Sequence, residues 1–255
     1  MKVPGLDQVV MNKIKAELVK AFGGDFYEII IGGAAFNKEV ETFFKRMEFP
    51  YSVGYGMTEC APIITFDDWK TARLYSCGKC VPNIELKIDS HDPINIAGEV
   101  LVKGANVFLG YFKNPDATNE VLDADGWFHT GDMGVIDADG YLYLRGRSKC
   151  MILGPSGQNI YPEEVEAALD TRPYVLESLV IEDDGGLTAL IYPDFDLGAK
   201  EGISQKAMVA MIENSLPEVN KEIPNYARLK RIEVMSEPFE RTPKKSIKRY
   251  LYQRK

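Results

Sequence analysis

Two short segments and a basic cluster contain residue types that could bind a phosphorylated sugar and a metal ion. Residues 55–59 end in Thr58 and Glu59, where the hydroxyl can donate to a phosphate oxygen and the carboxylate can hold Mg²⁺. Asp132 follows a glycine at a predicted strand end, where its carboxylate can accept hydrogen bonds from sugar hydroxyls. Basic residues cluster at 145–149. Each feature alone has an ordinary alternative: a helix N-terminus, a turn aspartate or a solvated edge.

The elements before and around residue 55 predict the closing units of a parallel α/β sheet. Apolar residues recur at helical spacing over residues 9–22, and the isoleucine-rich run 26–31 predicts a strand buried on both faces. Asn37 is placed to cap a second helix over 39–47, and a second strand is expected over 51–55.

Two turns of small residues follow these predicted strands. Residues 32–35 are Gly-Gly-Ala-Ala, and Gly56 opens the segment that contains Thr58 and Glu59. In open α/β sheets, ligands bind at the carboxyl ends of the strands. The sequence therefore predicts that both turns lie at a ligand site.

The rest of the chain predicts two further regions. Residues 73–147 hold short alternating runs separated by Gly, Pro, Asn and Asp turns, which indicates a small antiparallel barrel or sheet. Residues 150–255 predict a helix from Pro162, a hairpin, a helix over 204–216 and a last strand over 231–235. That order is typical of a compact α+β unit.

Composition excludes several classes of protein. Asp plus Glu number 38 and Lys plus Arg number 30, and the resulting net charge of −8 argues against non-specific nucleic-acid binding. No apolar stretch approaches a membrane span and the first residues do not resemble a signal peptide, so a cytoplasmic setting is expected. Cys77 and Cys80 form a C-x-x-C pair. A zinc or redox role is the alternative to four buried or half-buried thiols, which we favour because no second ligand pair accompanies them.

Taken together and in order, five segments resemble the motif series of the AMP-forming adenylating enzymes, which include acyl-CoA synthetases, luciferase-like ligases and peptide-synthetase adenylation domains. The segments are residues 32–35, 55–59 (Tyr-Gly-Met-Thr-Glu), 98–118, 126–132 (Gly-Trp-Phe-His-Thr-Gly-Asp) and 146–166. The resemblance covers essentially all 255 residues.

The resemblance implies a role for each matching position and implies ATP or AMP, Mg²⁺ and coenzyme A as ligands. Tyr55 and Gly56 correspond to the positions that stack on the adenine, and Gly33, Ala34 and Ala35 to those on the other side of the adenine. Thr58 corresponds to the residue that contacts the α-phosphate, and Glu59 to the residue that binds Mg²⁺. Asp132 and Arg147 correspond to the ribose-binding positions, Lys149 to the hinge, and Gly157 to the loop facing the pantetheine channel.

The same resemblance implies the architecture. Residues 1–72 are expected to be an α/β remnant of a doubly wound large domain, and 73–148 a β-barrel-like subdomain. Residues 149–255 are expected to form a mobile α+β C-terminal domain that swings between two half-reactions.

The loop between Lys149 and Gly157 is similar to that of long-chain fatty-acid–CoA ligases. The expected activity is therefore ATP-dependent conversion of a long-chain fatty acid to acyl-AMP and then to acyl-CoA. The alternatives are a ligase for an aryl or amino acid, a non-catalytic nucleotide- or CoA-binding module, and a scaffold. Peripheral membrane association and a homodimer stay open.

Two departures from the family pattern matter. The Gly/Ser/Thr-rich phosphate loop ending in Pro-Lys is absent, so the chain is expected to be the C-terminal part of a ligase and to adenylate poorly by itself. The terminal motif Thr-x-x-Gly-Lys-Ile-x-Arg aligns with residues 242–249, which puts Lys245 at the glycine and Ser246 at the catalytic lysine. We expect Lys245 to supply the missing ammonium.

Overall fold

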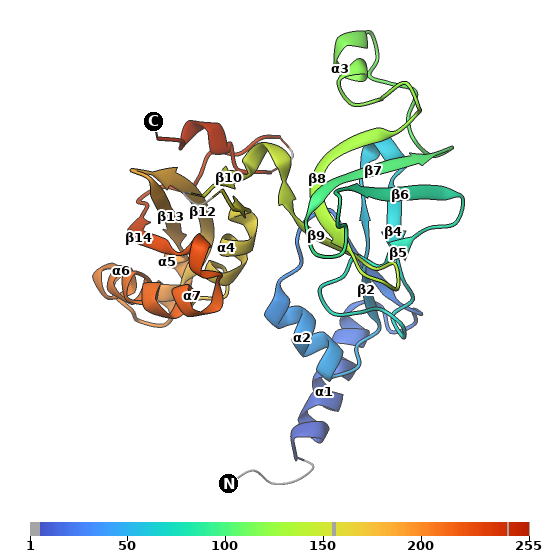
Figure 1. The fold of residues 1–255 in the computed structure, drawn as a ribbon. Coiled ribbons are helices and arrows are strands. Elements are labelled where there is room, and N and C mark those ends of the chain that lie inside the picture. Colours follow the sequence, from blue (N-terminus) through green and yellow to red (C-terminus); the bar gives the residue numbers. More distant parts are fainter. Residues whose placement is uncertain (1–5, 155–156, 244, 255) are drawn as a thin grey trace. The chain divides into compact units, whose positions relative to one another are not determined.

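The structure is a computed structural model that describes residues 6–154, 157–243 and 245–254 of the chain (Figure 1). It divides into two compact units, Met1–Arg145 and Gly146–Lys255. Each unit has its own hydrophobic core, so each is described by itself.

The first unit begins with a small parallel α/β layer. Helix α1 (Leu6–Ala21) precedes strand β1 (Ile29–Ile31), and helix α2 (Lys38–Arg46) leads to strand β2 (Tyr51–Val53). The two strands pair in parallel, with Ile29 opposite Tyr51. Asn37 caps α2 as predicted, since its side-chain oxygen accepts from the backbone N–H groups of Glu39 and Val40 at 2.9 and 3.0 Å.

The expectation that strand 26–31 is buried on both faces is wrong. Strand β1 covers only 29–31, and the Ile30 side chain is 46 % exposed. Alternate side chains of a strand point to opposite faces. Ile29 and Ile31 pack with aromatic residues of α2 and with α1, whereas Ile30 belongs to no hydrophobic cluster of the described residues.

Two antiparallel sheets complete the first unit. One consists of β3 (Tyr55–Gly56), β4 (Ile63–Phe66) and β5 (Lys79–Cys80). The other runs in the order β6 (Ile84–Asp89), β7 (Gly98–Gly104), β8 (Phe128–Ile136) and β9 (Leu142–Arg147), with α3 (Pro115–Asn119) between β7 and β8. Their shared core includes Ile64, Val100 and Leu142.

The expected barrel does not close within the described residues. A bridge between Lys79 and Tyr141 joins the edge strand β5 to the residue before β9. Strands β3 and β6 are the end strands of their sheets, and each has a described strand partner on one side only. The antiparallel character of this region is confirmed, and the two sheets pack around one core without a complete hydrogen-bonded ring.

The second unit is built on the sheet β12 (Val175–Asp183), β13 (Gly186–Pro193) and β14 (Leu229–Val234). Strand β13 pairs antiparallel with β12 and parallel with β14. The helices are α4 (Pro162–Leu169), α5 (Phe195–Lys200), α6 (Gln205–Asn214) and α7 (Leu216–Glu222). Residues of α4, α6 and α7 pack with one face of this sheet in a single cluster.

The helix expected over 204–216 is confirmed as α6, and a separate short helix follows it. Ser204 caps α6, which ends at Asn214, and α7 begins at Leu216 with Pro217 in its first turn. Proline lacks the backbone N–H that a continuing helix needs but suits the first turn of a new one. No helix of the described residues is long and apolar enough to cross a membrane.

Candidate functional site

The strand ends of the first unit meet as the sequence predicts. Because β1 and β2 are parallel, their carboxyl ends lie at one edge, and the Gly54 N–H donates to the Ile31 carbonyl at 2.9 Å. A side chain at Gly32 would lie 3.1 Å from the Gly54 oxygen, so the two turns approach closely. Gly33 has φ of 91°, and the residues Gly33, Ala34 and Ala35 are exposed.

Gly56 lies in a position that admits no side chain. A Cβ there would be 2.0 Å from the Pro62 carbonyl oxygen, because the chain folds back on itself between β3 and β4. That oxygen accepts a hydrogen bond from the Met57 N–H at 2.8 Å. The tight turn contains the 3₁₀ segment η1 (Thr58–Cys60), in which Thr58 is exposed and Glu59 is partly exposed.

Gly56→Ala is therefore expected to lower the free energy of unfolding of the chain by about 3 kcal/mol, the upper end for overpacking, because a backbone atom must move. Urea unfolding measures this loss. Gly104→Ala is the control, since its Cβ would lie no closer than 3.1 Å to a neighbour, and we expect it to cost about 1 kcal/mol. Equal stability of the two variants would contradict the proposed close contact.

Glu59 is held from a distant loop. Its carboxylate oxygen Oε1 accepts from the Tyr111 hydroxyl at 3.0 Å, and its backbone carbonyl accepts from the Phe108 N–H at 2.8 Å. The Asn106 side chain donates to the Cys60 carbonyl at 2.7 Å. The second oxygen, Oε2, makes no hydrogen bond or ion pair with any residue that the structure describes, which fits one carboxylate ligand of a Mg²⁺–phosphate complex.

Asp132 and Tyr55 are brought together although 77 residues separate them. The Tyr55 hydroxyl donates to Asp132 Oδ2 at 2.7 Å. Both are largely buried, with exposures of 8 % for Tyr55 and 7 % for Asp132. Asp132 lies on β8 next to an irregularity in its pairing with β7, where the Glu99 carboxylate accepts from the Gly131 N–H at 2.8 Å.

The sequence predictions did not include Tyr111, Asn106 and Glu99 as site residues. All three lie within the motif at 98–118, so the motif was the available signal. Their contacts with residues 59 and 131 depend on long-range pairing that no local pattern specifies.

The remaining predicted residues follow the boundary between the units at residue 145, which lies within β9. Arg147 ends β9, and Lys149 lies in the 3₁₀ segment η2 (Ser148–Cys150), both with exposed side chains. Gly157 has φ of 82° in the turn between β10 (Ile152–Leu153) and β11 (Asn159–Ile160). Positive φ is readily adopted only by glycine, which explains the residue type.

Lys245 lies at the exposed tip of a hairpin closed by an antiparallel bridge between Arg241 and Ile247. The Lys245 N–H donates to Thr242 O, and the Thr242 N–H donates to Ser246 O, each at 2.8 Å. Lys245 has φ of 64°, a conformation that favours glycine. This agrees with the alignment that puts Lys245 at a glycine position.

The cysteines have free thiols. Burial raises the pKa of Cys77 and of Cys60 to about 11, so both stay protonated at neutral pH. A protonated thiol is a poor nucleophile and metal ligand. No cluster of three or more His, Cys, Asp or Glu side chains suited to a metal occurs in the described ranges.

Comparison with known families gives two matches. Residues 3–112 match the family described as AMP-binding enzyme, and residues 151–255 match the AMP-binding enzyme C-terminal domain. Only residues 1–2 and 113–150 lie outside the two matches.

Similar curated proteins include ligases for different acids. The chain is 28 % identical to a long-chain-fatty-acid–CoA ligase of Mycobacterium bovis, over 95 % of this chain and 42 % of that protein. It is 36 % identical to a 2-succinylbenzoate–CoA ligase of Bacillus cytotoxicus, over 68 % of this chain and 37 % of the relative. It is also 36 % identical to a long-chain-fatty-acid–CoA ligase of Bos taurus, over 69 % of this chain and 24 % of that protein. The chain thus spans less than half the length of each of these relatives.

Solved structures share the fold. O-succinylbenzoate coenzyme A synthetase from Bacillus subtilis in complex with its acyl-adenylate intermediate superposes with a TM-score of 0.74 at 26 % identity, over 94 % of this chain and 49 % of that one. The same enzyme in complex with ATP and magnesium superposes with a TM-score of 0.73, over 93 % of this chain and 49 % of that one. ATP-bound MatB from Rhodopseudomonas palustris gives 0.71 at 25 % identity, over 96 % and 49 %.

Proposed function

The chain belongs to the AMP-binding, AMP-forming adenylating enzymes, and from this premise we propose that it is part of an ATP-dependent acid–thiol ligase. In the first half-reaction, a carboxylate oxygen of the acid attacks the α-phosphorus of ATP and pyrophosphate leaves. In the second, the thiol of coenzyme A attacks the acyl carbon and AMP leaves. The chain supplies binding and charge neutralisation, because neither step needs a covalent bond to the protein.

One observation carries the proposal: the turn at 33–35 and the segment 55–59 lie at one sheet edge, and Tyr55 bonds to Asp132 from a distant strand. A nucleotide needs an apolar surface for its base, an acceptor for its ribose hydroxyls and a carboxylate for its metal. The residues of this region include all three.

Each residue then has a role. Tyr55 and Gly56 stack on the adenine, with Gly33, Ala34 and Ala35 on its other side. Asp132 accepts from the ribose hydroxyls with help from Arg147, and Thr58 donates to the α-phosphate. Glu59 would hold Mg²⁺, which would neutralise phosphate charge when bound. In the second unit, Lys149 serves as the hinge and Gly157 faces the pantetheine of coenzyme A.

We propose a long-chain fatty acid as the acid substrate. The loop between Lys149 and Gly157 supports this choice, as do the fatty-acid ligases among the relatives. A bulky aryl acid is the second candidate, because a 2-succinylbenzoate–CoA ligase is equally similar at 36 % identity. The proposed enzyme is cytoplasmic and acts on small molecules. A role as a non-catalytic nucleotide- or CoA-binding module is the outcome if no acid is activated.

ATP–pyrophosphate exchange with a panel of fatty and aryl acids tests the function. We expect exchange by the complete gene product with long-chain fatty acids, and little by the 255-residue polypeptide alone, since the chain spans at most 42 % of these curated relatives. Exchange only with aryl acids would support the second candidate. No exchange with any acid would refute the ligase assignment, and vigorous exchange by the polypeptide alone would refute the need for further sequence.

Lys245→Gly is expected to slow exchange by about a hundredfold in the complete gene product, because it removes the ammonium that faces the transferred phosphate charge. Glycine keeps the left-handed backbone of residue 245, so a fall in rate reports the lost charge. Adding Ser246→Lys, which restores a lysine at the family position, should recover activity. An unchanged rate of exchange in Lys245→Gly would show that Lys245 does not supply the ammonium for adenylation.

A further inference from the structure

Residues 239–243 and 245–254, which we call the C-terminal strap, pack against the sheet of the second unit. Phe239 and Tyr252 of the strap stack edge to face at 5.1 Å between ring centroids, and they pack with Leu179, Ile181 and Leu190. These residues of β12 and β13 alternate with those that face the helices, so the strap covers the opposite face. The strap therefore completes the core of the second unit and contains the hairpin with Lys245 at its tip.

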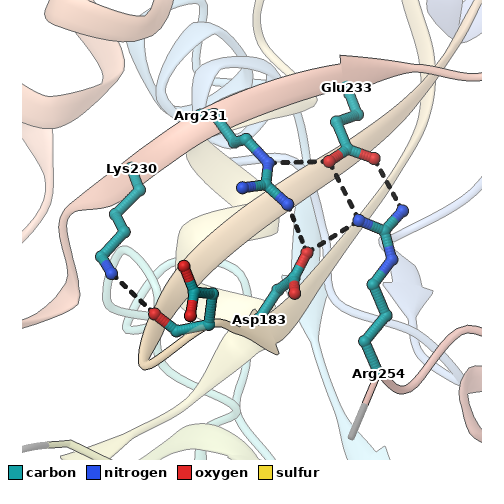
Figure 2. Close-up of polar contacts among 6 residues, drawn as sticks. Asp183, Lys230, Arg231, Glu233 and Arg254 are labelled. Carbon is teal, nitrogen blue, oxygen red and sulfur yellow. Dashed lines mark hydrogen bonds and ion pairs between the residues drawn. The ribbon is translucent and has the colours of Figure 1, made fainter.

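Arginines attach the strap at separate points. Arg249 pairs with Glu166, whose Oε1 also accepts from the Val180 N–H at 2.7 Å. At the far end, Arg254 bonds to Asp183 at 2.7 Å and to Glu233 at 2.6 Å (Figure 2). Figure 2 also shows Arg231 between the same two carboxylates, so positive and negative groups alternate.

The third arginine, Arg241, differs because it contacts the hairpin tip itself. Its Nη2 donates to Glu177 Oε1 at 2.7 Å, while Nη1 donates to the backbone carbonyl of Lys245. Glu177 belongs to β12, and its side chain is 14 % exposed. The planar guanidinium thus joins a half-buried carboxylate of the sheet to the turn, using two of its fixed donors.

The turn needs such support. Lys245 has φ of 64° without being glycine, and strained backbone of this kind persists only where surrounding contacts hold it. The turn's other described hydrogen bonds, between residues 242 and 245 and between 242 and 246, are internal to the hairpin. The bond from Arg241 also ties the turn to the sheet through Glu177.

We propose that Arg241, oriented by Glu177, is a positioning residue for adenylation: it holds the Lys245–Ser246 turn in the geometry that presents the ammonium to ATP. The inference rests on the proposed function for its catalytic consequence. Its structural part, that Arg241 fixes the turn, stands on the contacts alone.

The test compares Arg241→Ala with Arg254→Ala. Both arginines have side chains that are 41 % exposed and pair with a carboxylate that is 14 % exposed, but only Arg241 contacts Lys245. Hydrogen exchange of the Thr242 and Lys245 amides is measured on the 255-residue chain, and thermal unfolding checks the fold. We expect Arg241→Ala to remove protection of both amides and Arg254→Ala to leave it.

Activity is measured on the complete gene product in two assays, ATP–pyrophosphate exchange and transfer from a synthetic acyl adenylate to coenzyme A. Arg241→Ala is expected to slow exchange by about ten- to a hundredfold, since misplaced groups cost rate, and to leave acyl transfer unchanged. Arg241→Lys should recover only part of the rate, because an ammonium lacks the fork that reaches both partners. Glu177→Gln, which keeps an acceptor oxygen, should retain most of the activity.

Three outcomes would overturn the inference: retained amide protection in Arg241→Ala, an equal loss in both activity assays, or an equal loss of exchange in Arg254→Ala. Failure of the proposed function has a different signature, since the wild-type protein would then show no exchange with any acid. In that case Arg241 has no role in adenylation, and the amide protection still decides whether Arg241 fixes the turn.

Discussion

Replacing Glu59 with glutamine is expected to lower the rate of acyl-adenylate formation by about a hundred- to a thousandfold, with the fold intact. Glutamine keeps the acceptor for the Tyr111 hydroxyl but loses the negative charge that we propose as the Mg²⁺ ligand. The measurement is ATP–pyrophosphate exchange by the complete gene product across a magnesium titration. Because the metal affinity falls, the variant should need far more magnesium than the wild-type protein.

Tyr111→Phe is the matched control for Glu59→Gln. It removes one hydrogen bond to the same carboxylate, at 3.0 Å, and leaves the charge in place. We expect a loss of no more than about tenfold, because the negative charge of Glu59 remains in place. Wild-type rates for Glu59→Gln at every magnesium concentration would exclude Glu59 as the metal ligand.

Asp132→Asn is expected to lower exchange by about a hundredfold or more. The carboxylate can accept from both hydroxyls of a ribose, and bonds to a charged group are the stronger kind. The amide has no charge and offers one acceptor oxygen instead of two, so the Tyr55 hydroxyl and the two ribose hydroxyls compete for it. The steady-state constants for ATP in the complete gene product measure the loss.

Two comparisons isolate the ribose contact. Tyr55→Phe removes the hydroxyl that donates to Asp132 but keeps the ring, so only a several-fold loss is expected. With 2′-deoxy-ATP and 3′-deoxy-ATP, the wild-type protein should lose much of its rate, whereas Asp132→Asn should lose little more. If the rate loss from Asp132→Asn and the rate loss from a deoxy substrate were fully additive, Asp132 would not contact the ribose.

Local patterns predicted the parts of the fold that local physics decides. Asn37 as a helix cap, Pro162 at the start of α4, and the parallel pairing that brings residues 32–35 and 54–56 together all follow from sequence. The short helices α5 and α7 did not, because each has only six or seven residues and too little periodicity to detect.

The candidate site was predicted as a set of residues but not as an arrangement. The motif series pointed to Tyr55, Glu59 and Asp132, yet their partners come from distant parts of the chain. Tyr111 reaches Glu59 across 52 residues, and Arg241 binds Glu177 across 64. Such pairs depend on strand register and loop packing, which no window of sequence contains. The open barrel was missed for the same reason.

The C-terminal strap also has a consequence for the order in which the second unit can fold during synthesis. Strands β12 and β13 leave the ribosome long before residues 239–254, so the face formed by Leu179, Ile181 and Leu190 stays uncovered in the meantime. Hydrophobic surface that is exposed during folding makes intermediates prone to aggregate. A translational pause or a premature stop between β14 and the strap would leave that face open, and such products are natural targets for chaperones.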